Sequence, residues 1–186
     1  MIGAAGAANA GIVSFSATGG HADATWSIIA PPTSVGSDDF NDRMLRGFAE
    51  RQNITLDNDL ILGGQRIAAG TTVNAFGIFW DPRSGTTIQG DIRFDTDILG
   101  VATTFSELAK TDPIAGLGSV TYKDPTLRGL ESNRDSYAVA GDTLSIDFRA
   151  SSPGDFIRVF TAVPTPGAVA CLAAAGVGAV AIRRRR

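Results

Sequence analysis

The chain has 186 residues, a formal net charge of −3 and 44% hydrophobic residues, enough for one domain with a real core. The four C-terminal arginines contribute +4, so the rest of the chain carries −7, a balance poorly suited to binding nucleic acid or anionic lipid. The single histidine, His21, argues against a Ser-His-Asp triad or a multi-histidine metal site, and the single cysteine, Cys171, has no disulfide partner within the chain.

The first ten residues are small and apolar, and Ala8-Asn9-Ala10 has the small-x-small spacing of a signal-peptide cleavage site. We interpret residues 1–10 as the remnant of a signal peptide, with a mature chain that begins near Gly11. Because a basic start and a long hydrophobic segment are missing, we expect the true start to lie further upstream. The alternative is a protein that is not exported and has an Ala/Gly-rich leader.

Residues 11–162 are predicted to form one exported domain, because apolar and polar residues alternate in many short segments. Turn-forming Gly, Pro, Asn and Asp residues separate these segments. The combination predicts a mainly β fold, an antiparallel β-sandwich that is jelly-roll-like. The predicted strands cover residues 12–15, 25–28, 71–80, 91–94, 144–148 and 156–160.

One or two short helices are expected within this β domain. The better candidate begins at Thr104 and continues to Lys110, with Glu107 three residues after Thr104, the spacing of a capping box. A second candidate covers residues 43–51, although Gly47 lowers its helix propensity.

Three stretches rich in Asp and Asn, residues 38–42, 57–59 and 95–97, bring together the oxygen ligands that Ca²⁺ prefers. None matches the EF-hand loop. We select Asp57 and Asp59 as candidate Ca²⁺ ligands, and Ca²⁺ is the one cofactor that the sequence suggests. The alternative is that these are ordinary turn residues. Separately, we expect Asp155 and Arg158 to form an ion pair at the start of the last strand.

Sugar-binding sites usually combine an exposed aromatic ring with polar groups, and Trp26, Trp80 and Tyr122 are the candidates for such a ring. Trp80 precedes Asp81-Pro82 and is expected at a strand end, where its ring could stack on a sugar. The alternative is a core position for Trp80, because Phe76, Ile78 and Trp80 alternate along one face of the strand.

The sequence contains no recognisable catalytic constellation, and we predict that the protein is not an enzyme. Glycoside hydrolysis needs only two carboxylates, so residue types alone do not exclude it. The glutamates are Glu50, Glu107 and Glu131. Glu107 is expected at a helix start and Glu131 beside a turn.

The C-terminal segment 163–186 has three parts: Pro164-Thr165-Pro166, an apolar run of about fifteen residues, and an arginine cluster. A helix of that length spans roughly 22 Å, short against a hydrocarbon core of about 30 Å. It is therefore better suited to a transient membrane stage than to a permanent anchor. The arginines hold the helix end on the cytoplasmic side; they are Arg183, Arg184, Arg185 and Arg186. The alternative is a buried helix of the globular domain.

This three-part layout resembles the sorting signal of PEP-CTERM proteins, with Thr165 at the position where that motif usually has glutamate. The resemblance implies export, removal of the tail by an exosortase, and delivery to the cell surface or an exopolysaccharide matrix. Short segments of the domain, such as Phe79-Trp80-Asp81-Pro82 and Gly129-Leu130-Glu131, resemble segments of uncharacterised surface proteins that bear the same tail.

The sequence therefore predicts an exported structural or adhesive protein of the cell surface or the exopolysaccharide matrix. Its expected partners are the export machinery, an exosortase-type enzyme and exopolysaccharide, without nucleic acid, and it meets the membrane only through its tail. A glycan-binding module is the alternative function, and a glycan hydrolase is the third.

Overall fold

The computed structural model describes residues 11–36, 40–151 and 154–164, apart from the side chain of Pro125. The predicted leader lies outside these ranges, and so do Thr165, Pro166, the apolar run and the terminal arginines. Pro164 is the last described residue. Within the described ranges, no helix has both the length and the apolar character needed to cross a bilayer.

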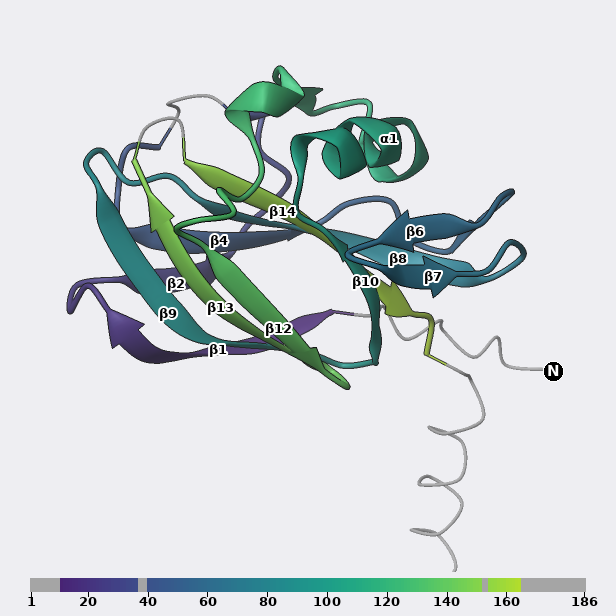
Figure 1. The fold of residues 1–186 in the computed structure, drawn as a ribbon, viewed down its shortest axis with the longest axis horizontal. Helices are drawn as coiled ribbons and strands as arrows, with labels where there is room; N and C mark the ends of the chain where they lie inside the picture. The colour runs from purple at the N-terminus through teal and green to yellow at the C-terminus, as the bar shows by residue number, and fades with distance from the viewer. Residues whose placement is uncertain (1–10, 37–39, 152–153, 165–186) are drawn as a thin grey trace, which may run out of the picture.

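Two sheets contain most of the strands, and the predicted mainly β architecture is confirmed (Figure 1). The four-stranded sheet has the order β1-β9-β13-β12, and the six-stranded sheet has the order β10-β14-β8-β4-β2 with β5 beside β8. Within these two sheets β2 and β4 are parallel, and the other pairs are antiparallel. The strands are β1 (Ile12–Gly20), β2 (Thr25–Ile28), β4 (Met44–Ala49), β5 (Ile54–Thr55), β8 (Thr72–Trp80), β9 (Thr86–Phe94), β10 (Ile98–Ala102), β12 (Ser136–Ala140), β13 (Thr143–Ala150) and β14 (Asp155–Ala162).

Smaller elements complete the described fold. Strands β3 (Ser34–Val35) and β11 (Thr121–Tyr122) pair in parallel, and β6 (Leu60–Leu62) and β7 (Gln65–Ile67) form an antiparallel hairpin. A single helix, α1 (Phe105–Ala115), and a 3₁₀ turn, η1 (Pro125–Leu127), are the helical elements of these residues.

Two buried clusters lie on opposite faces of the six-stranded sheet. The first fills the space between the two sheets, as in a β-sandwich, and includes Ile78, Ile146 and Ile157. The second lies beneath α1 and the β6–β7 hairpin and includes Leu108 and Phe160. Strands β8 and β14 are therefore buried on both faces, and nearly every one of their residues is buried.

The helix expected at Thr104 is confirmed and extends further than predicted, to Ala115. Thr104 and Glu107 form the capping box, in which each side chain accepts a hydrogen bond from the other residue's backbone N–H. The second helix candidate was wrong, because residues 44–49 form strand β4. There Leu45 and Phe48 are fully buried on opposite faces of the sheet, and this tertiary burial outweighs local helix propensity.

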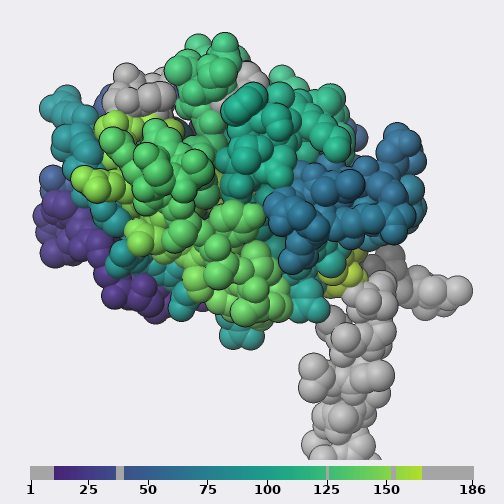
Figure 2. Space-filling model, in the orientation of Figure 1, coloured from purple at the N-terminus to yellow at the C-terminus, as the bar shows by residue number. Residues whose placement is uncertain are grey.

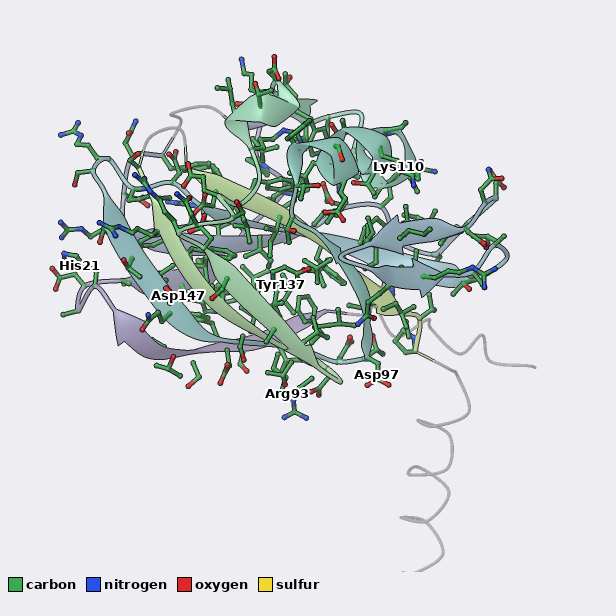
Figure 3. The ribbon with its side chains drawn as sticks, viewed as in Figure 1. His21, Arg93, Asp97, Lys110, Tyr137 and Asp147 are labelled. Carbon is green, nitrogen blue, oxygen red and sulfur yellow. The ribbon has the colours of Figure 1, made fainter. Side chains whose placement is uncertain are left out.

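The turn between β9 and β10, residues 95–97, holds both ends of the described domain. The Asp95 carboxylate accepts a hydrogen bond from the Gly11 backbone N–H at 2.8 Å. The Thr96 hydroxyl donates to the Ala162 carbonyl at 2.7 Å, and the Ala162 N–H donates to the Asp97 carbonyl at 2.9 Å. Figure 3 shows Asp97 beside the end of β14. The first and last strands thus start and end at the same edge of the molecule.

Candidate functional site

A pocket of about 460 Å³ opens between the start of α1, the segment from η1 to β12 and the turn between β13 and β14. Figure 2 shows α1 and the η1–β12 segment side by side at the surface. Phe105 and Leu127 line the pocket and are 60% and 46% exposed, so both present apolar surface to solvent.

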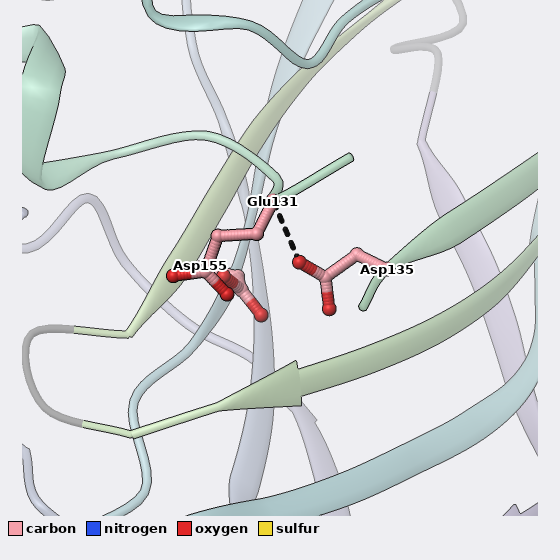
Figure 4. A group of neighbouring side chains, drawn as sticks. All are labelled: Glu131, Asp135 and Asp155. Atoms are coloured by element: carbon pink, nitrogen blue, oxygen red, sulfur yellow. Dashed lines mark hydrogen bonds between the residues drawn. The ribbon is translucent and has the colours of Figure 1, made fainter. Parts of the chain in front are cut away.

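Three carboxylates gather at one side of this pocket (Figure 4). Glu131 is exposed, Asp135 is half-buried and stands directly before β12, and Asp155 is the first residue of β14. One carboxylate oxygen from each residue lies within 4.8 Å of the others. The loop that holds Glu131 and Asp135 therefore meets the start of β14 at one acidic point, which we call the carboxylate cluster.

Backbone hydrogen bonds fix the position of Asp135 in the carboxylate cluster. One of its oxygens accepts the Glu131 N–H at 2.7 Å, and the other accepts the Arg149 N–H of β13 at 2.7 Å. The N–H groups of Arg134 and Asp135 both donate to the Glu131 carbonyl at 3.0 Å. The loop is thus closed into a tight turn and tied to the four-stranded sheet, which holds the Asp135 carboxylate in a defined orientation.

Asp155 is the buried member of the cluster, with only 4% of its surface exposed. Its Oδ2 atom is buried and has no hydrogen-bond partner among the described residues. Burial, together with the negative charges of Asp135 and Glu131, raises the pKa of Asp155 to about 8. Near neutral pH this carboxyl therefore keeps its proton unless a positive charge enters the site.

Asp57 and Asp59, the Ca²⁺ ligands expected from sequence, lie at the edge of the β6–β7 hairpin. Asp59 accepts hydrogen bonds from the Arg66 side chain at 2.7 Å and from the Ala69 N–H at 2.9 Å, so both of its carboxylate oxygens are engaged. The bond from Arg66 lowers the pKa of Asp59. Asp57 is exposed, and among the described residues no third acidic side chain joins the pair to share an ion. The geometry favours the alternative, a turn-stabilising role.

Trp80 cannot serve as a sugar platform, because its side chain is completely buried in the core between the two sheets. Trp80 lies on the same face of β8 as Phe76 and Ile78, and all three side chains belong to this core, as the alternative interpretation expected. Trp26 is half-buried and packs against Phe15, with ring centroids 5.8 Å apart.

Tyr122, the third aromatic candidate, is partly buried and packs against the second buried cluster. Its hydroxyl donates a hydrogen bond to Glu50 at 2.6 Å, and burial is the main reason that its pKa is raised. The exposed aromatic residue at the pocket is Phe105 instead. The sequence around Thr104 does not indicate whether Phe105, in the first turn of the helix, is exposed or buried in the core.

The expected ion pair between Asp155 and Arg158 is absent. The two residues stand three positions apart in β14, so their side chains project from opposite faces of the strand. Arg158 is fully buried and donates two hydrogen bonds to Glu50, including one from Nη2 to Oε1 at 2.8 Å. Its Nη1 also contacts Asp112 of α1 at 3.0 Å.

Arg158 belongs to a buried network that joins α1 to the six-stranded sheet. Asp112 receives a second guanidinium, that of Arg128, with nitrogen–oxygen distances of 3.1 and 2.7 Å. The Thr111 hydroxyl accepts a hydrogen bond from Arg158 at 2.7 Å. Two arginines and two carboxylates balance in charge, which favours a structural role for this network.

The other titratable residues considered from sequence lie away from the pocket or act in local structure. His21 lies in the loop between β1 and β2 (Figure 3) and is not among the residues that line the pocket. Glu107 caps α1 and also accepts the Gly63 N–H at 2.7 Å. Of the glutamates, Glu131 alone lines the pocket.

Comparison with known proteins adds no relative to this picture. No family model, no curated protein and no solved structure matches the chain.

Proposed function

We propose that the protein is an exported structural or adhesive component of the cell surface or the exopolysaccharide matrix, processed at its C-terminal sorting signal by an exosortase-type enzyme. The terminal segments support export, and the acidic, disulfide-free domain fits a soluble exported module. The structural observation that carries the proposal is the common attachment of Gly11 and Ala162, near the two ends of the described domain, to residues 95–97.

This attachment supports a proposed orientation of the displayed domain. Strand β14 begins at the pocket with Asp155 and ends at Ala162, two residues before Pro164. Eight residues of strand cover about 25 Å, so the pocket lies at the opposite end of β14 from Ala162. We propose that the pocket points away from the bilayer while the tail is in the inner membrane.

Replacing Arg183, Arg184, Arg185 and Arg186 with alanine should prevent sorting, because the positive charge that holds the tail end on the cytoplasmic side is removed. We expect the amount of protein in the surface and medium fractions of the native host to fall about tenfold, measured by quantitative immunoblotting. The matched control is Arg83→Ala, which removes an exposed arginine from the domain and should not change the distribution. Unchanged sorting of the tail variant would contradict the proposal.

A glycan-binding module is the second candidate, and the pocket favours it. Phe105 offers an exposed ring in the pocket that the carboxyl groups of Glu131 and Asp155 also line, the combination of apolar platform and polar groups that sugars require. The jelly-roll topology expected from the sequence would also support glycan binding, since jelly-roll sandwiches occur among lectin domains. A hydrolase finds less support, because the carboxyl group with the raised pKa, that of Asp155, is buried too deeply to reach a glycosidic oxygen.

Phe105→Ala should weaken binding to host exopolysaccharide by about tenfold, because stacking of an aromatic ring on the sugar is lost. The comparison is Ile61→Ala on β6, which removes a similarly exposed apolar side chain outside the pocket and should bind as the unsubstituted protein does. Binding is measured on immobilised exopolysaccharide by surface plasmon resonance. Equal binding by all three proteins would rule out a site at Phe105.

A further inference from the structure

We propose that Glu131, Asp135 and Asp155 form a Ca²⁺ site at the side of the pocket. The ion would join the loop at Glu131, the residue before β12 and the start of β14. Nothing in the sequence predicted this grouping, which is distinct from the Asp57 and Asp59 pair. The carboxylate cluster would bind Ca²⁺ whether or not the tail is processed, so the two proposals fail separately.

The spacing of the three carboxylates suits calcium. Ca²⁺–oxygen bonds are about 2.4 Å long, so two ligands on opposite sides of the ion lie about 4.8 Å apart. The three oxygens lie within 4.8 Å of one another, so a single ion can reach all of them. The donors are carboxylates without histidine or cysteine, a set that favours Ca²⁺ over zinc.

The buried oxygen of Asp155 is the second, independent observation that points to a ligand. Buried carboxylates in folded proteins are normally hydrogen-bonded or paired with a positive charge. Asp155 Oδ2 has neither among the described residues, and Figure 4 shows this side chain turned toward Glu131 and Asp135. A bound cation would provide the missing partner.

No side chain in the described pocket supplies that charge instead. Arg128 lines the pocket, but its guanidinium donates to both oxygens of Asp112 and to the Lys123 carbonyl. Asp135 has its backbone hydrogen bonds at 2.7 Å and still presents one oxygen within reach of the other two carboxylates. The pocket beside Glu131 is open, so water can complete the coordination sphere of a Ca²⁺ ion, which takes six to eight oxygens.

Magnesium fits this arrangement less well. It requires near-ideal octahedral geometry with bonds of about 2.0 to 2.1 Å and gives up its water reluctantly. The carboxylate cluster combines an exposed glutamate, an aspartate fixed by backbone hydrogen bonds and a buried aspartate, which suits the irregular coordination of calcium. We expect an affinity in the range of extracellular calcium modules, with a Kd of about 10⁻⁴ to 10⁻³ M.

The test is calcium titration of the full-length chain by isothermal calorimetry, supported by thermal unfolding with about 10 mM CaCl₂ or MgCl₂. For the unsubstituted protein we expect saturable Ca²⁺ binding and a Tm higher by about 3 to 6 °C in calcium, with a smaller rise in magnesium. Asp155→Asn and Glu131→Gln should each weaken Ca²⁺ binding by about tenfold or more, because the charge of the ligand set falls.

Asp57→Asn is the matched control, since it removes an exposed carboxylate at the site expected from sequence and should leave Ca²⁺ binding unchanged. Glu131→Gln alters an exposed side chain and should retain the fold, which keeps the test informative if Asp155→Asn perturbs packing. The proposal is overturned if the unsubstituted protein binds no Ca²⁺, if the Glu131 variant binds as tightly as the unsubstituted protein, or if binding depends on Asp57.

Discussion

Arg158→Met is expected to lower the free energy of unfolding by about 3 to 5 kcal/mol, because it leaves the carboxylate of Glu50 buried without a counter-charge. Arg158 is fully buried, and Glu50 is 3% exposed. After the substitution, Glu50 would keep the Tyr122 hydroxyl as a hydrogen-bond partner, and Asp112 would keep Arg128. Neither replaces the lost guanidinium at Glu50. Urea unfolding followed by tryptophan fluorescence measures the change.

The double variant Glu50→Leu with Arg158→Met distinguishes the net contribution of the ion pair to stability from the cost of leaving one buried charge without a counter-charge. Because both charges are removed, we expect the double variant to be more stable than Arg158→Met alone. If Arg158→Met unfolds at the same urea concentration as the unsubstituted protein, the network does not hold α1 against the sheet.

Asp155→Asn should change how stability depends on pH when calcium is absent. The folded carboxyl has a pKa of about 8, whereas the unfolded chain has the ordinary value of 3.8. Between these values the folded state binds the extra proton, so the free energy of unfolding falls as pH rises, and the loss is complete above the folded pKa. One pKa unit corresponds to about 1.4 kcal/mol, so the total decline amounts to several kcal/mol.

An asparagine at this position cannot ionise, so the variant should lack this part of the pH dependence. We expect Asp155→Asn to become progressively more stable than the unsubstituted protein as the pH is raised from 4.5 to 8.5 in a chelating buffer. Saturating Ca²⁺ should remove most of the difference by stabilising the ionised carboxylate of the unsubstituted protein. The prediction is contradicted if the stability of the two proteins changes with pH in the same way and the chelator makes no difference, because Asp155 would then ionise with an ordinary pKa.

Much of the β architecture could be predicted because period-two patterns reflect burial directly. The strand predicted at residues 25–28 matches β2, and the strands predicted at 71–80 and 156–160 match β8 and β14 within two residues. Residues 44–49 were misread because strand β4 is buried on both faces and so lacks the alternation of a one-sided strand. The helix at Thr104 could be found because its capping box is a local signal.

The candidate site could not be predicted, because it depends on long-range register and loop packing. Glu131 and Asp135 precede β12 of the four-stranded sheet and Asp155 begins β14 of the six-stranded sheet, so their meeting depends on how the two sheets pack. Closeness in sequence was misleading for Asp155 and Arg158, which project from opposite faces of β14. Asp57 and Asp59 showed the opposite problem, since turn-forming aspartates and calcium ligands have the same local composition.

The most direct test of the proposed function is the intact mass of the protein recovered from the surface and medium fractions of its native host. Export and sorting predict a mature chain that lacks residues 1–10 and the tail after the Pro164 motif, while residues 11–162 remain intact. A full-length chain found only in the cytoplasm or the inner membrane would contradict the proposed surface role.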